Sequence, residues 1–218
     1  MVAKPKKRAT YQDVLDAPEH MVAEILDGEL FLTSGSRRKH LENASSLGAF
    51  LKSAFDFGIG GPGGWRVLKK PELHHDLDIV VPDIAGWRDG RLVDAPDEDE
   101  PYITVVPDWL CEVQSPGTAR IDRMKKMPIY AREGVRHVWL ADPRERAIDV
   151  YRLNGRGGFT FVGTVGGDEP IRAEPFDDVE IAPTFVWGRP AAPGSAKTVA
   201  KKKRASTKKP SARTSRRR

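Results

Sequence analysis

The sequence predicts an α/β fold in which a mixed β-sheet is flanked by helices. Strand-like segments alternate with amphipathic helical segments along the middle of the 218-residue chain, and two of the strand-like segments are almost continuously apolar, which is typical of strands covered on both faces. The length suits one domain of ordinary size with short ends, and is too short for two large domains. We expect a disordered basic arm at residues 1–9, a domain at residues 10–189 and a disordered Lys/Arg-rich tail at residues 190–218.

The order of the elements follows from turn signals and hydrophobic periodicity. Thr10 precedes apolar residues at helical spacing, so we expect one N-terminal helix that is broken at Pro18. The pair Asp27-Gly28 predicts a tight turn into the next strand. The expected elements, in order, are the broken helix at 10–26, a strand at 29–33, a helix at 38–57, strands at 65–70, 78–87 and 109–114, a helix at 119–133, a strand at 136–141 and a hairpin of strands at 147–153 and 159–165.

Local signals add detail to two loops and one helix. The glycine-rich segment 58–64 and the acidic segment 94–100 are expected to be surface loops. We expect Thr118 to cap the helix that follows it, Pro128 to kink this helix and Gly134 to end it.

Charge is distributed unevenly along the chain. The tail has six lysines, five arginines and no acid, and residues 11–189 hold 21 basic residues against all 31 acidic ones. A flexible cationic segment binds nucleic acid by counterion release, and would raise the substrate concentration near an acidic domain. A solubilising tail without a dedicated ligand is the alternative. The residues expected to contact nucleic acid are Lys201, Lys202, Lys203, Arg204, Lys208, Lys209, Arg216, Arg217 and Arg218.

Composition also excludes some classes of protein. Cys111 is the only cysteine, so neither an intrachain disulfide nor a thiolate metal cluster can form within one chain. No stretch reaches the roughly 18 to 20 apolar residues that a membrane span needs, and the basic N-terminus has no apolar core of a signal peptide. We therefore expect a cytoplasmic protein that has no membrane partner.

Two acidic residues stand inside the apolar strand segments. Asp83 lies between Pro82 and Ile84, and Glu112 lies between Cys111 and Val113. Burying an isolated carboxylate is strongly unfavourable unless a partner or a metal stabilises it, so the two acids together indicate one shared cation. The alternative for each acid is a place at a strand end or an ion pair with a basic residue.

Several ordered motifs carry a resemblance to a known family. They are Glu24-Ile-Leu-Asp-Gly-Glu-Leu, Pro82-Asp83, Cys111-Glu112-Val-Gln114-Ser-Pro-Gly-Thr118, Asp122-Arg-Met-Lys-Lys126, Tyr130-Ala-Arg-Glu-Gly-Val135 and Trp139-Leu-Ala-Asp-Pro143. Over residues 11–188 the chain resembles a bacterial restriction endonuclease family, formerly a domain of unknown function, of the PD-(D/E)XK nuclease superfamily.

The resemblance implies a restriction endonuclease-like sheet with a metal site at one end. Asp83, Glu112 and Glu24, the last on an N-terminal helix, would hold one or two Mg²⁺ (or Mn²⁺) ions, and the backbone carbonyl of Val113 would reach the metal. Carboxylates without Cys or His suit Mg²⁺, which is a hard cation. The implied activity is metal-dependent endonuclease hydrolysis of DNA phosphodiester bonds.

One position departs from the superfamily pattern. The superfamily has lysine two residues after the second acid, where this chain has Gln114, which offers hydrogen bonds to water or phosphate but no positive charge. The resemblance implies that the catalytic lysine has moved to the next helix as Lys126, on the helix face of Asp122 and Tyr130. The alternatives are a surface ion pair between Lys126 and Asp122, a strand-end position for Gln114, and Lys125 in the phosphate role.

Other candidate residues carry weaker signals. The segment His74-His75-Asp76-Leu77-Asp78 has transition-metal ligands, although adjacent histidines in a loop are more often solvated. His40 is a candidate for assisting catalysis, against simple solvation at a helix start. Cys111 is expected to be a small buried hydrophobic residue.

Two functional interpretations therefore stay open. The first is a metal-dependent endonuclease with a catalytic set of Glu24, Asp83, Glu112, Gln114 and Lys126. The second is a catalytically inactive nuclease-fold protein that binds nucleic acid through its basic tail, and Gln114 favours it slightly. Enzymes that cut both DNA strands are often dimers, and the sequence leaves a homodimer open because it contains no decisive interface signature.

Overall fold

The computed structural model describes residues 8–34, 38–92 and 100–188. The basic arm except its last two residues, most of the acidic segment 94–100, and the whole cationic tail lie outside the described residues. Among the described residues, no helix has both the length and the apolar character that crossing a membrane requires.

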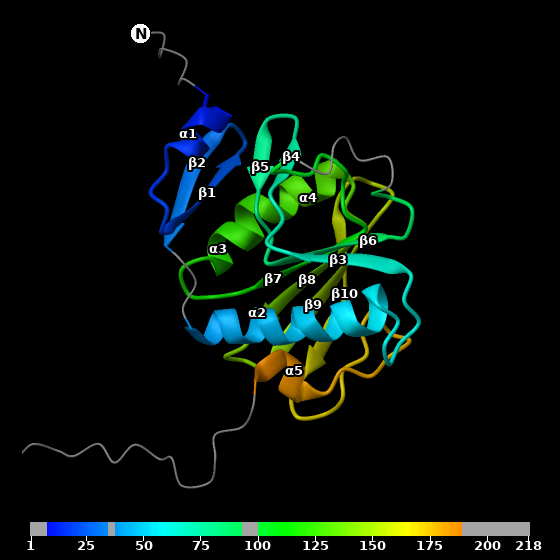
Figure 1. Cartoon of the computed structure of the whole chain (residues 1–218). Coiled ribbons are helices and arrows are strands. Elements are labelled where there is room, and N and C mark those ends of the chain that lie inside the picture. The colour runs from blue at the N-terminus through cyan, green and yellow to red at the C-terminus, as the bar shows by residue number, and fades with distance from the viewer. Residues whose placement is uncertain (1–7, 35–37, 93–99, 189–218) are drawn as a thin grey trace, which may run out of the picture.

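Two sheets form the framework (Figure 1). The six-stranded sheet has the order β10-β9-β8-β7-β6-β3, and the four-stranded sheet has the order β2-β1-β5-β4. The large sheet is mixed, because β7 and β8 pair in parallel while its other neighbours are antiparallel. The strands are β1 (Met21–Leu26), β2 (Glu29–Ser34), β3 (Trp65–Lys69), β4 (Leu73–His75), β5 (Asp78–Val80), β6 (Ile84–Arg88), β7 (Trp109–Val113), β8 (His137–Asp142), β9 (Ala147–Leu153) and β10 (Phe159–Gly166).

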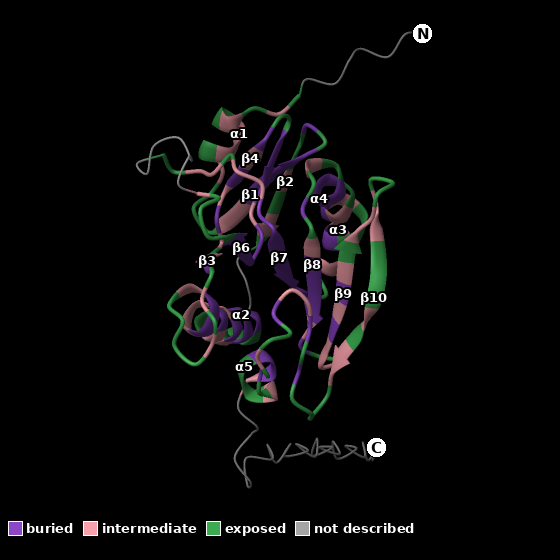
Figure 2. Cartoon of the chain, turned by 90° about the vertical axis from the view of Figure 1, so that its right-hand side faces the viewer, coloured by how far each residue is buried: buried purple, intermediate pink, exposed green. Residues whose placement is uncertain are grey.

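Helices cover both faces of the large sheet, as the buried strands β7 and β8 require (Figure 2). One face packs against α2 (Arg38–Leu51), the π-helical turn η1 (Lys52–Asp56) and α5 (Pro183–Trp187). The other face packs against α4 (Met127–Glu133), which follows α3 (Ala119–Ile121) and the π-helical turn η2 (Asp122–Lys126). The remaining helix is α1 (Tyr11–Leu15). This architecture confirms the predicted α/β fold with a mixed sheet.

The prediction of a broken helix at residues 10–26 was wrong beyond residue 15. Residues 21–26 form β1, which pairs with β2 along its whole length. Asp27 and Gly28 both have positive φ, at 53° and 75°, and join the strands in a two-residue turn. Such turns match the twist of a hairpin, so the Asp-Gly signal fixes a strand on both of its sides. Glu24 therefore lies on a strand and not on a helix.

The segment 78–87 forms two strands rather than one. β5 belongs to the small sheet and β6 to the large sheet, and the chain passes between them at residues 81–83. Pro82 has no backbone N–H to donate to a sheet, so the strand breaks there. The break places Asp83 directly before β6, where the two sheets meet.

The two long helices are confirmed, with irregularities. Gly134 ends α4 in the left-handed conformation, with φ of 89°. Thr118 makes no capping hydrogen bond, contrary to the prediction, because its hydroxyl accepts from the Ser115 backbone N–H at 3.3 Å. The interruption of the helix falls at the π-helical turn η2, just before Pro128, which has no N–H to donate to a carbonyl one turn earlier.

Candidate active site

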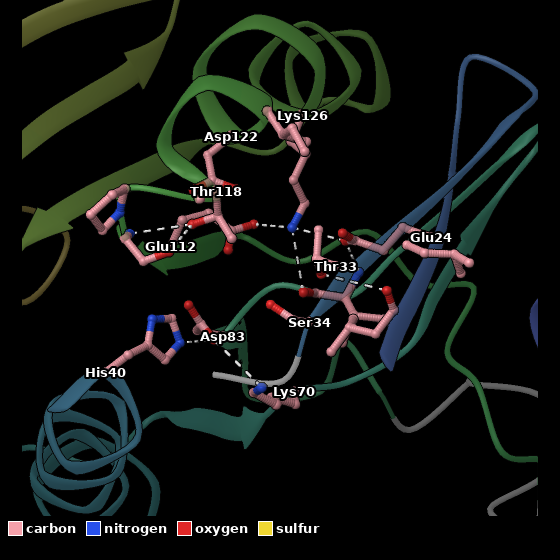
Figure 3. A pocket seen from close by; sticks show the side chains of 17 residues that line it. Glu24, Thr33, Ser34, His40, Lys70, Asp83, Glu112, Thr118, Asp122 and Lys126 are labelled. Atoms are coloured by element: carbon pink, nitrogen blue, oxygen red, sulfur yellow. Dashed lines mark hydrogen bonds and ion pairs between the residues drawn. The ribbon is translucent and has the colours of Figure 1, made fainter. Parts of the chain in front are cut away.

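A pocket of about 330 Å³ opens where the small sheet meets the end of β7 (Figure 3). Residues from β1, β2, the first turn of α2, the segment before β6 and the turn η2 line it. Its ionisable lining residues are the acids Glu24, Asp83, Glu112 and Asp122, the lysines Lys70 and Lys126, and His40. The structure thus brings together three acids that lie far apart in the sequence, and adds a fourth.

Glu112 and Lys126 form the inner part of the pocket. Glu112 Oε1 accepts a hydrogen bond from the Tyr130 hydroxyl at 2.5 Å and lies 2.7 Å from Lys126 Nζ. The same ammonium nitrogen lies 2.9 Å from Glu24 Oε1 and donates to the Val81 carbonyl at 3.4 Å. Lys126 is therefore a buried cation shared by two acids, and the alternative of a surface ion pair with Asp122 was wrong.

Asp83 is held from three sides near the mouth of the pocket. Its Oδ2 accepts from the backbone N–H of Val113 at 2.9 Å, and its Oδ1 lies 2.9 Å from His40 Nε2 and 4.0 Å from Lys70 Nζ. These contacts follow from topology, because β6 runs antiparallel to β7 with Ile84 opposite Cys111. The carboxylate that precedes β6 therefore meets the residue that ends β7.

The pocket shifts the pKa values of its acids in opposite directions. Burial raises the pKa of Glu112 to about 8, the nearby carboxylates add to the rise, and Lys126 offsets only part of it. Burial likewise raises the pKa of Asp122 to about 6. Burial also opposes ionisation of Asp83, but the hydrogen bond from His40 and the other contacts outweigh it and lower the pKa. Negative charge therefore exceeds the positive charge that the pocket itself supplies.

The donor set fits a hard divalent cation. Carboxylate oxygens are the ligands that Mg²⁺ prefers, and the only cysteine, Cys111, points into the core on the other face of β7. Among the described residues, however, no three Asp, Glu, His or Cys side chains are already arranged around one metal position. The reason is visible at Lys126, whose ammonium lies between Glu24 and Glu112.

Two residues predicted for phosphate contact lie elsewhere. Gln114 is buried but does not line the pocket, because its Oε1 accepts from Arg123 Nη2 at 3.1 Å. Lys125, the rival of Lys126, lies 3.9 Å from Asp27 and over the ring of Phe31, away from the pocket. Of these two lysines, Lys126 lines the pocket and Lys125 does not.

The histidine-rich segment is part of the small sheet and not a metal centre. His74 lies 2.7 Å from Glu72 and stacks on Tyr102 at 3.9 Å between ring centroids. Asp78 accepts hydrogen bonds from Arg132 and from the backbone of Asp27. These side chains therefore have structural partners, which explains a polar cluster without a metal.

His40 is buried in the pocket and not solvated at a helix start. Solvation at a helix start was the preferred interpretation, yet His40 is 9% exposed and contacts Asp83. A signal was present, because His40 begins the apolar stripe that continues with Ala44, Leu47 and Leu51 at spacings of four, three and four. A histidine in phase with such a stripe faces inward.

The fold and the pocket define a restriction endonuclease-like protein, with a mixed sheet between helices and carboxylates at one end of it. The model of the Uma2 family, described as "Putative restriction endonuclease", matches residues 9–184, and the chain belongs to this family. The chain is also similar to "a putative nuclease belonging to DUF820 from Anabaena variabilis ATCC 29413", at 19% identity and a TM-score of 0.65 over 82% of this chain and 97% of that one. That likeness establishes the fold. No curated protein matches the chain.

Proposed function

We propose that the protein is a divalent-metal-dependent endonuclease that hydrolyses DNA phosphodiester bonds. Membership of a family described as restriction endonucleases supports a nucleic-acid substrate. The observation that carries the proposal is the pocket itself, where four acids face two lysines and one histidine at the junction of the two sheets. A divalent cation would balance the carboxylates of this pocket and would also neutralise charge on a bound phosphodiester.

In the proposed site, Asp83 and Glu112 bind the cation, and Glu24 supplies the third acid next to Lys126. A bound divalent cation lowers the pKa of a water molecule and neutralises charge on the phosphodiester. Burial raises the pKa of Glu112 to about 8, so its carboxyl group would have to lose a proton in order to hold the cation.

The surrounding residues fix these carboxylates in place. His40 and the Val113 N–H hold both oxygens of Asp83, and the Tyr130 hydroxyl holds Glu112. All three N–H groups of Lys126 have protein acceptors, so it contributes positive charge to the pocket rather than a free donor. Lys70 brings a second positive charge to the mouth of the pocket.

A second function is a nuclease-fold protein that binds nucleic acid without cutting it. Two observations favour it. Gln114 stands where the superfamily has lysine and is turned toward Arg123, and Lys126 lies between two acids that would otherwise be free to share a metal. The eleven basic residues of the tail would supply the binding in this case.

A plasmid-nicking assay on the full chain separates the two functions. We expect the wild type to nick DNA with Mg²⁺ or Mn²⁺ and to be inactive with EDTA, and we expect Glu112→Ala to be inactive with either metal. Glu169→Ala removes an exposed acid from a loop outside the pocket and is the matched control. Salt-sensitive DNA binding by a wild type that never nicks DNA would support the second function instead.

A further inference from the structure

Two continuous segments of the described residues carry a net positive charge, 38–70 and 119–136, and the first of them runs along one rim of the large sheet. Residues 38–70 carry six basic side chains and two acidic ones, a formal charge of +4. The other described residues carry 14 basic and 25 acidic side chains, a formal charge of −11. The basic residues of the first segment are Arg38, Lys39, Lys52, Arg66, Lys69 and Lys70. All of these except Lys39, which lies about 100° around α2 from Arg38, form the surface that is called the α2–β3 edge below.

The fold places these residues side by side along α2 and β3. Arg38, Ser45 and Lys52 are seven residues apart, which puts them on one side of α2. Lys69 on β3 donates to the Ser45 hydroxyl at 2.5 Å, and Lys52 donates to the carbonyl of Val67 at 3.1 Å. Because β3 is the terminal strand of the large sheet, this pairing lies at the rim of the domain (Figure 1).

Both elements lead to the candidate active site. His40, in the first turn of α2, contacts Asp83, and the backbone N–H of Lys70, just after β3, donates to the Asp83 carbonyl at 3.0 Å. Lys69 lies opposite Ile84, the first residue of β6. The α2–β3 edge therefore starts at the carboxylate that we assign to the cation and runs away from it.

The side chains of this edge are accessible to a large ligand. The exposed fractions are 92% for Arg38, 57% for Arg66, 38% for Lys52 and 31% for Lys70, and Lys69 is also exposed. The two acids offset only part of the charge, since Glu42 pairs with Arg38 and the buried Asp56 is shared by Lys52 and Arg66. The edge thus keeps a net positive charge on accessible side chains.

We propose that the α2–β3 edge binds the phosphate backbone of the nucleic acid on one side of the cleavage position. From Arg38 to Lys52 the helix spans about 21 Å at 1.5 Å per residue. A duplex presents one phosphate of each strand per roughly 3.4 Å of its axis, so the edge matches about six phosphates of one strand. The proposal rests on the proposed function for its ligand, and it explains how an otherwise acidic domain admits DNA to an acidic pocket.

The test compares two double variants of the full chain with the same change in net charge. Arg38→Gln/Lys69→Gln alters the edge, and Arg144→Gln/Arg156→Gln alters two exposed turns beside β9, toward the opposite side of the large sheet. The affinity for a short DNA duplex is measured in EDTA at several salt concentrations, so that no cleavage is needed. Thermal unfolding of each variant shows that it folds.

We expect the edge variant to lose several-fold affinity at low salt, and the slope of log affinity against log salt concentration to fall by about one for each basic side chain removed. The turn variant should stay close to wild type. Arg38→Gln alone should give about half of the change in slope even if Lys69→Gln disturbs the contact with Ser45. Equal losses in both double variants, or no loss in the edge variant, would overturn the proposal.

The same measurements distinguish a failure of the α2–β3 edge as a binding surface from a failure of the proposed nuclease activity. A wild type that binds DNA through the edge and never cuts it in Mg²⁺ or Mn²⁺ would refute the nuclease and leave the edge standing. A wild type that cuts DNA while the edge variant binds and cuts as well as the turn variant would refute the edge alone.

Discussion

Glu112→Gln should change how the stability of the metal-free protein depends on pH. The substitution keeps the shape of a side chain that is 3% exposed and replaces an ionisable carboxyl by a neutral amide. In the wild type, burial raises the pKa of Glu112 from the ordinary value of 4.5 to about 8. Between these two values the unfolded chain has lost the proton and the folded protein keeps it, so the free energy of unfolding falls as the pH rises.

The size of this effect follows from the same two values. The difference between 4.5 and about 8 corresponds to about 5 kcal/mol at 1.36 kcal/mol per pKa unit. Stability is unaffected by Glu112 below pH 4.5, declines as the pH rises through about 8, and is level above that. Glu112→Gln has no such decline, because its amide does not titrate.

Urea unfolding in EDTA at about pH 5 and about pH 9 measures the difference. We expect the wild type to lose several kcal/mol more than Glu112→Gln between these two conditions. Asp149→Asn, at a half-buried acid outside the pocket, serves as the control and should behave as the wild type does. The same loss in wild type and Glu112→Gln would refute the argument that the pocket is short of positive charge.

Three further predictions address other parts of the account. Lys126→Met removes the cation from between two buried carboxylates, so in EDTA it should lower the free energy of unfolding by about 3 to 5 kcal/mol, and Mg²⁺ should recover more stability for this variant than for the wild type in a thermal-shift assay. His40→Ala should weaken Mn²⁺ binding by about 10- to 100-fold in calorimetry, with His40→Gln restoring part of it, and unchanged affinity would remove His40 from the site. Deleting residues 190–218 should lower DNA affinity and its salt dependence, and unchanged affinity would exclude a role of the tail in binding.

The sequence predicted the fold well where local signals were strong. The helix at 38–57 and the hairpin at 147–165 were found because their periodicity is regular and their turns are marked by glycine or asparagine. The helix predicted at 20–26 failed because a short apolar run does not distinguish helix from strand. The segment forms a strand because it pairs with β2, and the Asp27-Gly28 turn had already indicated a hairpin.

From the residues alone, the candidate site was predicted mainly in its carboxylates, whereas the role of Lys126 was implied by the family resemblance. An acid inside an apolar run is visible in a sequence, and Asp83 and Glu112 both line the pocket. The partners of these acids depend on how a helix is rotated against a sheet. That rotation turned Lys126 toward two acids and Arg123 toward Gln114, and no spacing along the chain determines it.

Diffraction from crystals soaked in Mn²⁺ is the most direct test of the central claim, which is that the acids of this pocket hold a divalent cation. The account predicts an anomalous peak in the pocket, with carboxylate oxygens of Asp83 and Glu112 at about 2.0 to 2.6 Å from it. The peak should vanish in crystals of Glu112→Ala. A pocket without a peak, or a peak bound only by residues outside it, would contradict the claim.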